Sequence, residues 1–404
     1  MKSYLLIISI TLTLALSGCI KDDYDESNDD NKFGREWYEL VKTDTLNIRQ
    51  LTQEVNGNPL PLGSSLVRNS FLYHSLYGSD TITLSGAVCW PVGTDCHTEI
   101  WLESHYLTTR WNQCPSQQGQ PGMIVCAMRN AIYIGADYQG LGLSRNLDQP
   151  YLNTILLASQ NIDCYKAAMT LIKEYGPDVV DNYSTYNIGY SLGGAVSMAI
   201  ARQIEHDPEL MESMHLKKTL CGGGPYDQEI YLNYFFENPS MELTYPIAFL
   251  CAIKSIISSS PSFRTQYDLK DLFSDKLLNS GIYEALCSKN YDTDQINLML
   301  HETGCESLET IFSPQFLDRN SQMNKDIFRE IAKLDITDGW TPRIPILVRH
   351  SKTDTYVPFV CMERVMDLWA DNPNFTYDII ESAEHKKDGS SFYKNVIFNN
   401  YPLD

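Results

Sequence analysis

The first patterned part of the chain alternates short apolar stretches with turn residues. The stretches are rich in β-branched and aromatic residues, and Gly, Pro, Asn or Ser-Asp separates one from the next, which is typical of strands. They cover residues 45–52, 66–77, 80–90, 97–103 and 131–136. The pattern therefore predicts a series of strands in this part of the chain.

The spacing of apolar residues changes after residue 150. Between residues 151 and 175 they recur every three or four positions, which predicts a helix that ends at Gly176-Pro177. We then expect a strand at 186–189, a helix at 192–205 and a strand at 216–221. Alternating strands and helices of this kind predict a mostly parallel sheet covered by helices on both faces.

The alternation stops between residues 225 and 340. This stretch has several helical patterns and one apolar run, 245–257, but no clear strand. A strand at 344–349, a helix at 359–369, a strand at 375–380 and a helix near 390–397 then follow. We therefore expect a single sheet domain in two parts, 41–224 and 341–404, interrupted by a helical insertion at 225–340.

The amino terminus has the pattern of an export signal. Lys2 precedes an apolar run, 4–16, that is shorter than the roughly 20 residues needed to cross a bilayer. The run ends in Leu16-Ser17-Gly18-Cys19, which resembles a bacterial lipobox. The resemblance implies a signal peptide at 1–18 and membrane attachment through lipid on Cys19. An ordinary signal peptide with a chance cysteine is the alternative.

Residues 19–40 read as an acidic tether. Six acidic residues and two lysines lie between Lys21 and Lys32, which gives a net charge of 2 − 6 = −4. Such runs are most often solvated and flexible. The Lys-Asp-Asp directly after Cys19 also resembles a surface-export tag of lipoproteins from one Gram-negative group. We expect an outer-membrane lipoprotein that faces either the periplasm or the outside.

Charge and composition exclude two classes of protein. The 404 residues carry 31 basic and 51 acidic side chains, a net charge of −20, which excludes a typical nucleic-acid partner. With +1 on the signal and −4 on the tether, −20 − 1 + 4 = −17 remains on the rest of the chain. Hydrophobic residues make up 43% of the chain, which excludes a disordered protein.

Ten cysteines remain when Cys19 is set aside, and no CxxC occurs among them. This excludes zinc ribbons and thioredoxin-type redox motifs. Export allows disulfides, and Cys89–Cys96 and Cys114–Cys126 are the local candidate pairs. Other cysteines sit in apolar runs typical of buried thiols: Cys164, Cys221 and Cys251.

The sharpest chemical signal is a GxSxG motif centred on Ser191. A predicted strand precedes it and a predicted helix follows it, which is the context that a nucleophilic serine needs. Gly189 and Gly193 lack Cβ atoms where the tight turn approaches neighbouring backbone. The turn exposes Ser191 at a helix amino end, where backbone N–H groups favour negative charge.

A serine nucleophile needs a base and an acid that orients the base. In α/β-hydrolases these follow in the order serine, acid, histidine. Asp354 lies just after the predicted strand 344–349, where such sheets place their sites. His385 is the only one of eight histidines that follows Asp354, and we place it on a polar loop. His350, at the end of the same strand, is expected to make a local hydrogen bond instead.

Four parts of the sequence together resemble the α/β-hydrolase superfamily, and within it the lid-bearing secretory lipase and esterase group. They are Gly189-Tyr190-Ser191-Leu192-Gly193-Gly194, Ala136-Asp137-Tyr138-Gln139-Gly140-Leu141-Gly142-Leu143-Ser144, Asp354 with Val357-Pro358, and His385. The second part is similar to the D-Y-x-G-x-G-x-S that shapes the floor of the site in that group. The resemblance implies an α/β-hydrolase fold, a mostly parallel sheet flanked by helices, with an inserted helical cap.

The loop that normally donates one oxyanion N–H departs from the family pattern. It usually reads His-Gly-x, but here Tyr106 follows His105. Leu192, directly after the nucleophile, is the first expected donor. Leu107 is our choice for the second donor, with Tyr106 as the alternative.

We therefore expect an exported, lipid-anchored serine hydrolase that cleaves small-molecule or lipid esters. Ser191 is the nucleophile, His385 the base and Asp354 the acid, and no metal or organic cofactor is required. Aromatic residues of the insertion are expected either to line an apolar pocket, together with the run 247–257, or to form the core of the cap. These residues are Tyr231, Tyr234, Phe235 and Phe236.

Two alternatives remain open. An exopeptidase or acyltransferase can use the same fold, and a peptidase needs an acid that binds the substrate amine. Glu229, Glu237 and Glu242 are the candidates for that acid. The alternative from a different class is a non-catalytic binding lipoprotein that retains the fold.

Overall fold

The computed structural model describes residues 36–48, 65–94 and 96–403. The predicted signal peptide, Cys19 and most of the acidic tether lie outside these residues. Within the described chain, no helix combines the length and the apolar composition needed to cross a membrane.

The described strands form one sheet in the order β1-β2-β3-β5-β4-β6-β7-β8-β9. Strands β1, β2, β3 and β5 pair antiparallel, and every neighbouring pair from β5 through β4 to β9 is parallel. The mostly parallel sheet expected from the sequence is therefore confirmed. The strands are β1 (Tyr38–Asn47), β2 (Ser65–Tyr77), β3 (Asp80–Pro91), β4 (Cys96–Ser104), β5 (Ile132–Ala136), β6 (Asp178–Tyr190), β7 (Leu216–Gly222), β8 (Ile346–Ser351) and β9 (Phe375–Ile380).

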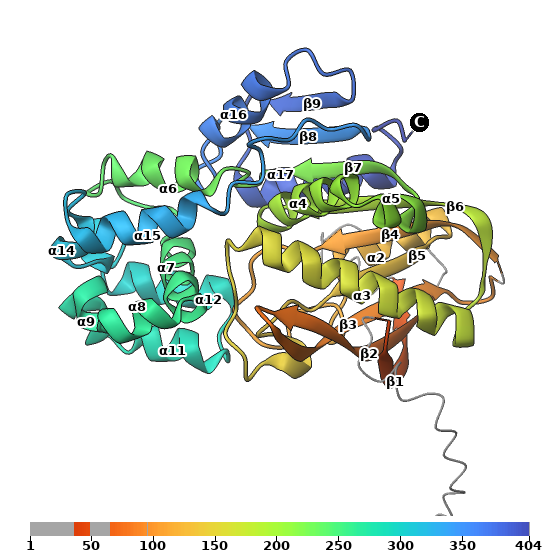
Figure 1. Ribbon diagram of the computed structural model, residues 1–404, viewed down its shortest axis with the longest axis horizontal. Coiled ribbons are helices and arrows are strands. Elements are labelled where there is room, and N and C mark those ends of the chain that lie inside the picture. The colour runs from red at the N-terminus through yellow and green to blue at the C-terminus, as the bar shows by residue number, and fades with distance from the viewer. Residues whose placement is uncertain (1–35, 49–64, 95, 404) are drawn as a thin grey trace, which may run out of the picture.

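Helices cover both faces of this sheet (Figure 1). Helices α3 (Thr154–Tyr175) and α4 (Leu192–His206) pack together on one face, while α2 (Pro121–Arg129) and α17 (His385–Ile397) pack together on the other. Strands β5 and β8 are buried at every residue because both faces are covered. Helix α16 (Val360–Leu368) adds its buried side chains to the core on the α3 and α4 face.

Four elements differ from those predicted by the sequence. Helix α2 was not expected, because Pro121-Gly122 resembles a loop, yet proline fits the first turn of a helix, where its missing N–H is not needed. Strand β6 begins at Asp178 rather than 186, and β1 begins at Tyr38, whereas we expected a strand over 45–52. Residues 49–52 of that expected strand lie outside the described residues. Helix α17 begins at His385 itself, so the polar loop expected around this histidine is the first turn of a helix.

Residues 225–340, which we call the helical segment, contain helices and one isolated β-bridge between Phe273 and Phe312. The described residues of this segment form no strand longer than that bridge. The helical segment lies beyond the ends toward which β7 and β8 point (Figure 1). Its helices are α6 (Gln228–Phe236), α7 (Ile247–Ser259), α8 (Pro261–Gln266), α9 (Leu269–Leu272), α10 (Asp275–Leu278), α11 (Ile282–Ser288), α12 (Thr293–Glu302), α13 (Leu308–Ile311), α14 (Pro314–Leu317) and α15 (Gln322–Ala332).

Neither of the two candidate disulfides is present, because all four cysteines are free thiols. Cys89 on β3 and Cys96 on β4 are close in sequence, but β5 lies between these strands in the sheet. Cys114 and Cys126 belong to the two separate hydrophobic clusters on opposite sides of the sheet. The topology therefore separates both pairs.

Candidate active site

Ser191 lies at a strained turn between β6 and α4. Its backbone has φ 61° and ψ −129°, a combination that costs a non-glycine residue about 1–3 kcal/mol. The Ser191 N–H donates to the carbonyl of Gly222 on β7 at 2.8 Å. Strand and helix therefore hold the serine in a conformation that projects its side chain from the sheet edge.

Two glycines make this turn possible, as the sequence predicts. A Cβ atom on Gly189 would overlap the backbone of Gly193. A Cβ on Gly193 would overlap the carbonyl of Ser104, at the end of β4. Only a hydrogen atom fits at either position, so the turn at Ser191 packs directly against the loop that follows β4.

The structure brings the three predicted catalytic side chains together. His385 Nε2 lies 2.9 Å from the Oγ of Ser191. His385 Nδ1 lies 2.5 Å from Oδ2 of Asp354. A continuous chain of hydrogen bonds thus runs from the carboxylate through the imidazole to the hydroxyl, although the three residues lie up to 194 positions apart.

The environment of Asp354 stabilises its ionised form. Its Oδ1 accepts hydrogen bonds from the N–H groups of Tyr356 at 2.8 Å and Val357 at 2.9 Å. Burial raises the pKa of Asp354, but the neighbouring His385 and the hydrogen bond from Val357 outweigh burial, so the pKa lies below its usual value. The carboxylate is therefore charged at neutral pH and can fix the tautomer of His385.

His350 has the local role expected for it. It is fully buried, and its Nε2 donates to the carbonyl of Val357 at 2.9 Å. Burial lowers the pKa of His350, so the ring is neutral. Its Nε2 lies 3.8 Å from Oδ2 of Asp354.

The loop after β4 approaches the serine from the other side. Leu107 lines the same cavity as Ser191, and its N–H donates to no other described residue. Tyr138, whose ring stacks on His105, donates from its hydroxyl to the His105 carbonyl at 3.1 Å and so holds the loop in place. Tyr106, which replaces the usual glycine, exposes its side chain to the cavity.

The segment that resembles the D-Y-x-G-x-G-x-S of the family has a supporting position. The carboxylate of buried Asp137 accepts hydrogen bonds from Ser85 Oγ at 2.5 Å and from Ser116 N and Oγ at 2.8 and 2.6 Å. Gly140 and Gly142 adopt positive φ angles of 87° and 54°. This segment therefore ties the neighbouring loops together rather than presenting reactive groups.

A cavity of about 520 Å³ opens at Ser191 and His385. The loop after β4, the start of α2, helix α17 and the helical segment line it. The helical segment contributes residues that the sequence analysis missed: Tyr245, Asp292, Thr293 and Asp294. Asp292, Thr293 and Asp294 lie together at the start of α12 and form no recognisable motif, while Tyr245 begins the apolar run 245–257, which suggested no role for its ring.

The aromatic residues predicted as possible pocket lining do not line this cavity. The rings of Tyr231 and Phe235 pack on Phe249 at centroid distances of 5.8 and 4.7 Å. The ring of Phe236 packs instead against Phe312, Phe316 and Phe328, while Tyr234 is exposed. Tyr231, Phe235 and Phe236 thus belong to the core of the helical segment, the second of the two expected roles, whereas Tyr234 has neither role.

A column of stacked rings connects the helical segment to the candidate base. Tyr245 stacks on Tyr356 with 4.3 Å between centroids and 8° between planes. Tyr356 in turn stacks on His385 with 5.0 Å between centroids and 27° between planes. The column forms one wall of the cavity and restricts rotation of the imidazole.

A buried polar network lies behind the other side of His385. Arg349 on β8 donates to Asp388 at 2.8 Å and to Asp378 at 2.8 Å. Asp388 also accepts from the hydroxyl of Tyr190 at 3.0 Å. Tyr190 immediately precedes Ser191, and Asp388 lies one helical turn after His385, so the network connects the candidate nucleophile with the candidate base.

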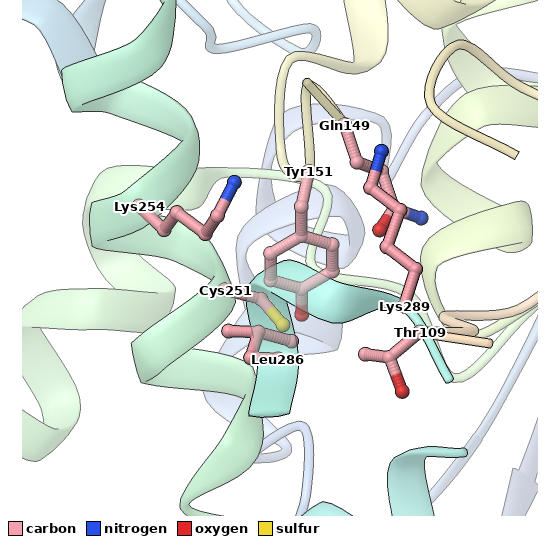
Figure 2. Close-up of a pocket in the computed structure, with 7 residues that line it drawn as sticks. All are labelled: Thr109, Gln149, Tyr151, Cys251, Lys254, Leu286 and Lys289. Atoms are coloured by element: carbon pink, nitrogen blue, oxygen red, sulfur yellow. The ribbon is translucent and has the colours of Figure 1, made fainter. Parts of the chain in front are cut away.

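A second, small cavity of about 20 Å³ lies where the helical segment meets the sheet domain. Figure 2 shows Lys254 and Lys289 beside it. The Lys289 ammonium donates to the carbonyls of Gly140 at 2.9 Å, Arg145 at 2.8 Å and Leu147. Burial lowers the pKa of Lys289 to about 8. The cavity has room for about one water molecule. Lys289 therefore does not bind a ligand there but, through these hydrogen bonds, anchors the helical segment to the sheet domain.

In the described part of the chain, no three His, Cys, Asp or Glu side chains are grouped so that they could hold a metal ion.

Neither a protein-family model nor a curated protein matches the chain in sequence. Solved structures do match. The rice cell wall degrading esterase LipA from Xanthomonas oryzae has a TM-score of 0.70 at 19% identity, over 89% of this chain and 96% of its own. Candida antarctica lipase A in its closed state has a TM-score of 0.61 at 12% identity, over 93% of this chain and 85% of its own. The chain therefore has the α/β-hydrolase fold of esterases and lipases.

Proposed function

We propose that the protein is a serine hydrolase that cleaves carboxylic esters through an acyl-enzyme. The observation that carries the proposal is the chain of hydrogen bonds from Asp354 through His385 to Ser191, at 2.5 and 2.9 Å. A non-catalytic binding protein would have no need for this alignment or for the strained backbone of Ser191.

In the proposed reaction, Ser191 Oγ attacks the ester carbonyl while His385 Nε2 takes its proton. Asp354 keeps the proton on Nδ1 and stabilises the imidazolium that forms. The imidazolium then gives its proton to the leaving alcohol, and the acyl group remains on Ser191. Water, activated by His385 in the same way, releases the acid and restores the serine.

The oxyanion of each tetrahedral intermediate needs hydrogen-bond donors that are already in place. We assign this role to the N–H groups of Leu192, at the amino end of α4, and Leu107, in the loop after β4. The contact between this loop and Gly193 supports the assignment, because it holds both donors beside Ser191. The dipole of α4 favours the same negative charge.

The helical segment would act as a cap that sets substrate choice. Its supporting observation is the position of Tyr245 and Thr293 in the cavity wall. Lys386, next to His385, also forms an ion pair with Asp294 of α12 across the cavity.

We further propose that the protein is a lipid-anchored bacterial outer-membrane protein. The lipobox-like sequence at Cys19 and the acidic tether support this location. Labelled palmitate should be incorporated into the full chain but not into Cys19→Ala. Protease added to intact cells should then distinguish a surface-facing protein, which is cleaved, from a periplasmic one, which is protected.

Reaction with a fluorophosphonate probe tests the catalytic proposal directly. The full chain should be labelled and should hydrolyse 4-nitrophenyl acetate, and Ser191→Ala should lose labelling and about 10⁴-fold or more of kcat. Asp354→Asn should lower kcat by about 10⁴-fold because the wrong tautomer of His385 is then favoured. Ser159→Ala, an exposed serine on α3, is the matched control. Turnover retained in Ser191→Ala would refute the proposal.

An exopeptidase on the same fold receives less support. The acids considered for amine binding, Glu229, Glu237 and Glu242, do not line the cavity. Asp294 does line it, but its carboxylate is paired with Lys386. Comparing turnover of a 4-nitrophenyl ester with that of an aminoacyl anilide separates the two activities.

A further inference from the structure

The cavity beside Ser191 offers little aliphatic surface. Among the described residues that line it, Leu107 and Pro121 are the only aliphatic side chains. The apolar run of α7, from Ile247 to Ile257, is buried inside the helical segment instead. A long acyl chain would therefore find no aliphatic tunnel in this cavity.

Several polar groups in the cavity wall have no partner within the described chain. The side-chain amides of Gln113 and Gln118 and the hydroxyls of Tyr356 and Ser390 line the cavity, and none makes a hydrogen bond to another described residue. They belong to three different parts of the fold: the loop before α2, the loop after β8, and α17. Their donors and acceptors are free for a ligand.

These groups distinguish between two kinds of ester. An alkyl chain would displace water from the amides and hydroxyls without replacing its hydrogen bonds, which is unfavourable. A ligand that carries several hydroxyl groups would replace those bonds one for one. Sites built to hydrogen-bond a substrate hydroxyl discriminate strongly against analogues that lack it.

The aromatic wall supports the same choice. The ring faces of Tyr245 and Tyr356 are stacked on each other, and Tyr356 is stacked on His385. Tyr356 therefore lies between two rings, so its edge and hydroxyl group are what it presents to the cavity. A phenolic edge contributes a hydrogen-bonding group and little of the flat apolar surface that a fatty chain would need.

We propose that the substrates are short-chain acyl esters of hydroxyl-rich compounds, such as acetylated sugars, rather than long-chain lipid esters. This inference rests on the proposed ester hydrolysis at Ser191. It assigns Gln113, Gln118 and Ser390 to binding of the hydroxyl-rich part, and the aromatic wall to closure of the cavity around it.

Two substrate series test the inference with the full chain. The first consists of 4-nitrophenyl acetate, butyrate, octanoate and palmitate. The second consists of methyl β-xylopyranoside and methyl glucopyranoside, each carrying one acetyl group, with cyclohexyl acetate as the ring-shaped control without hydroxyls. We expect kcat/KM to fall at least about tenfold from butyrate to palmitate, and the acetylated glycosides to exceed cyclohexyl acetate by about tenfold or more.

Variants then connect the preference to the named side chains. Gln118→Ala and, separately, Ser390→Ala should each lower kcat/KM for the acetylated glycosides by about 2- to 10-fold, mainly through KM, because each removes one hydrogen bond. In each variant, the ratio of kcat/KM for the acetylated glycosides to kcat/KM for cyclohexyl acetate should therefore fall as well. Gln117→Ala is the matched control, since the Gln117 amide donates to Ser116 outside the cavity.

The outcomes separate this inference from the proposed function. If kcat/KM rises with chain length up to palmitate, or if glycosides and cyclohexyl acetate are turned over equally, the substrate inference is wrong while Ser191-dependent ester hydrolysis stands. If no ester in either series is hydrolysed in a Ser191-dependent manner, the proposed function itself is wrong.

Discussion

Arg349 and Asp388 form an ion pair with 2.7 Å between guanidinium nitrogen and carboxylate oxygen, and their side chains are only 4% and 0% exposed. The pair connects β8, whose end leads to Asp354, with α17, which begins at His385. It therefore fixes the spacing between the strand that leads to Asp354 and the helix that begins at His385.

Replacing Asp388 by alanine should destabilise the protein and misplace His385. Arg349 would keep its contact with Asp378 but lose its buried partner, and removal of one member of a buried pair costs about 3–5 kcal/mol. We expect a free energy of unfolding that is lower by about 3 kcal/mol, measured by urea denaturation. Asp367→Ala, an exposed aspartate on α16, should change it by less than about 0.5 kcal/mol.

Replacing Tyr190 by phenylalanine isolates the connection to the nucleophile. The ring of Tyr190 keeps its packing against His385, but the hydroxyl that donates to Asp388 at 3.0 Å is lost. We expect a loss of about 1 kcal/mol in unfolding free energy. We also expect kcat to fall about 3- to 10-fold with KM nearly unchanged, because the change acts on alignment rather than on substrate binding.

Tyr183→Phe is the matched control for that prediction. The Tyr183 hydroxyl donates to the carbonyl of Ser213 at 2.9 Å, away from the cavity. Loss of this hydrogen bond should lower the free energy of unfolding by a similar amount and leave kcat unchanged. If both variants lower kcat equally, the Tyr190 hydroxyl has a structural role only.

The three residues of the proposed triad could be singled out in the sequence because each lies in a local pattern. Gly189 and Gly193 are required by close backbone contacts two positions on either side of Ser191. Asp354 follows a buried strand, and His385 is the only histidine after it. The mostly parallel sheet could be predicted for the same reason, because each strand shows a local run of apolar residues in the sequence.

The remaining parts of the site depend on contacts between distant segments, which no local pattern records. Asp388 meets Tyr190 across 198 positions, and Tyr245 meets Tyr356 across the boundary of the helical segment. The two candidate disulfide pairings were wrong for a related reason. Proximity in sequence suggested Cys89 with Cys96, but insertion of β5 between their strands separates them.

Replacing Gly193 by alanine should disrupt the oxyanion loop. The new Cβ would overlap the backbone carbonyl of Ser104, which cannot move without displacing the loop that leads to Leu107. We expect kcat for 4-nitrophenyl acetate to fall by about 10²-fold or more, as when an oxyanion donor is lost. Gly339→Ala, at a glycine whose Cβ would meet no atom within 4 Å, is a control for strain at a positive φ without this overlap. Equal activity in the two variants would contradict the assignment of the loop.

Glu103 should make the stability of the protein depend on pH. This carboxyl, at the end of β4, is fully buried and accepts a hydrogen bond from the N–H of Gly122 at 2.9 Å. Burial raises the pKa of Glu103 from 4.5 to about 7, although its hydrogen bonds with Tyr393, Gly122 and Tyr133 lower it. Between these two pH values, the folded protein keeps a proton that the unfolded chain has lost.

The unfolded chain thus binds fewer protons, so stability must fall as pH rises from about 4.5 to about 7. The difference between a pKa of 4.5 in the unfolded chain and about 7 in the folded protein corresponds to about 3 kcal/mol. Glu103→Gln, which resembles the protonated form, should abolish this loss. Urea denaturation of both proteins at about pH 4.5 and pH 8 measures the free energy of unfolding at each pH. From the lower to the higher pH, this free energy should fall by about 3 kcal/mol more in the wild type than in the variant. Parallel losses in the two proteins would mean that Glu103 is ionised in the folded state.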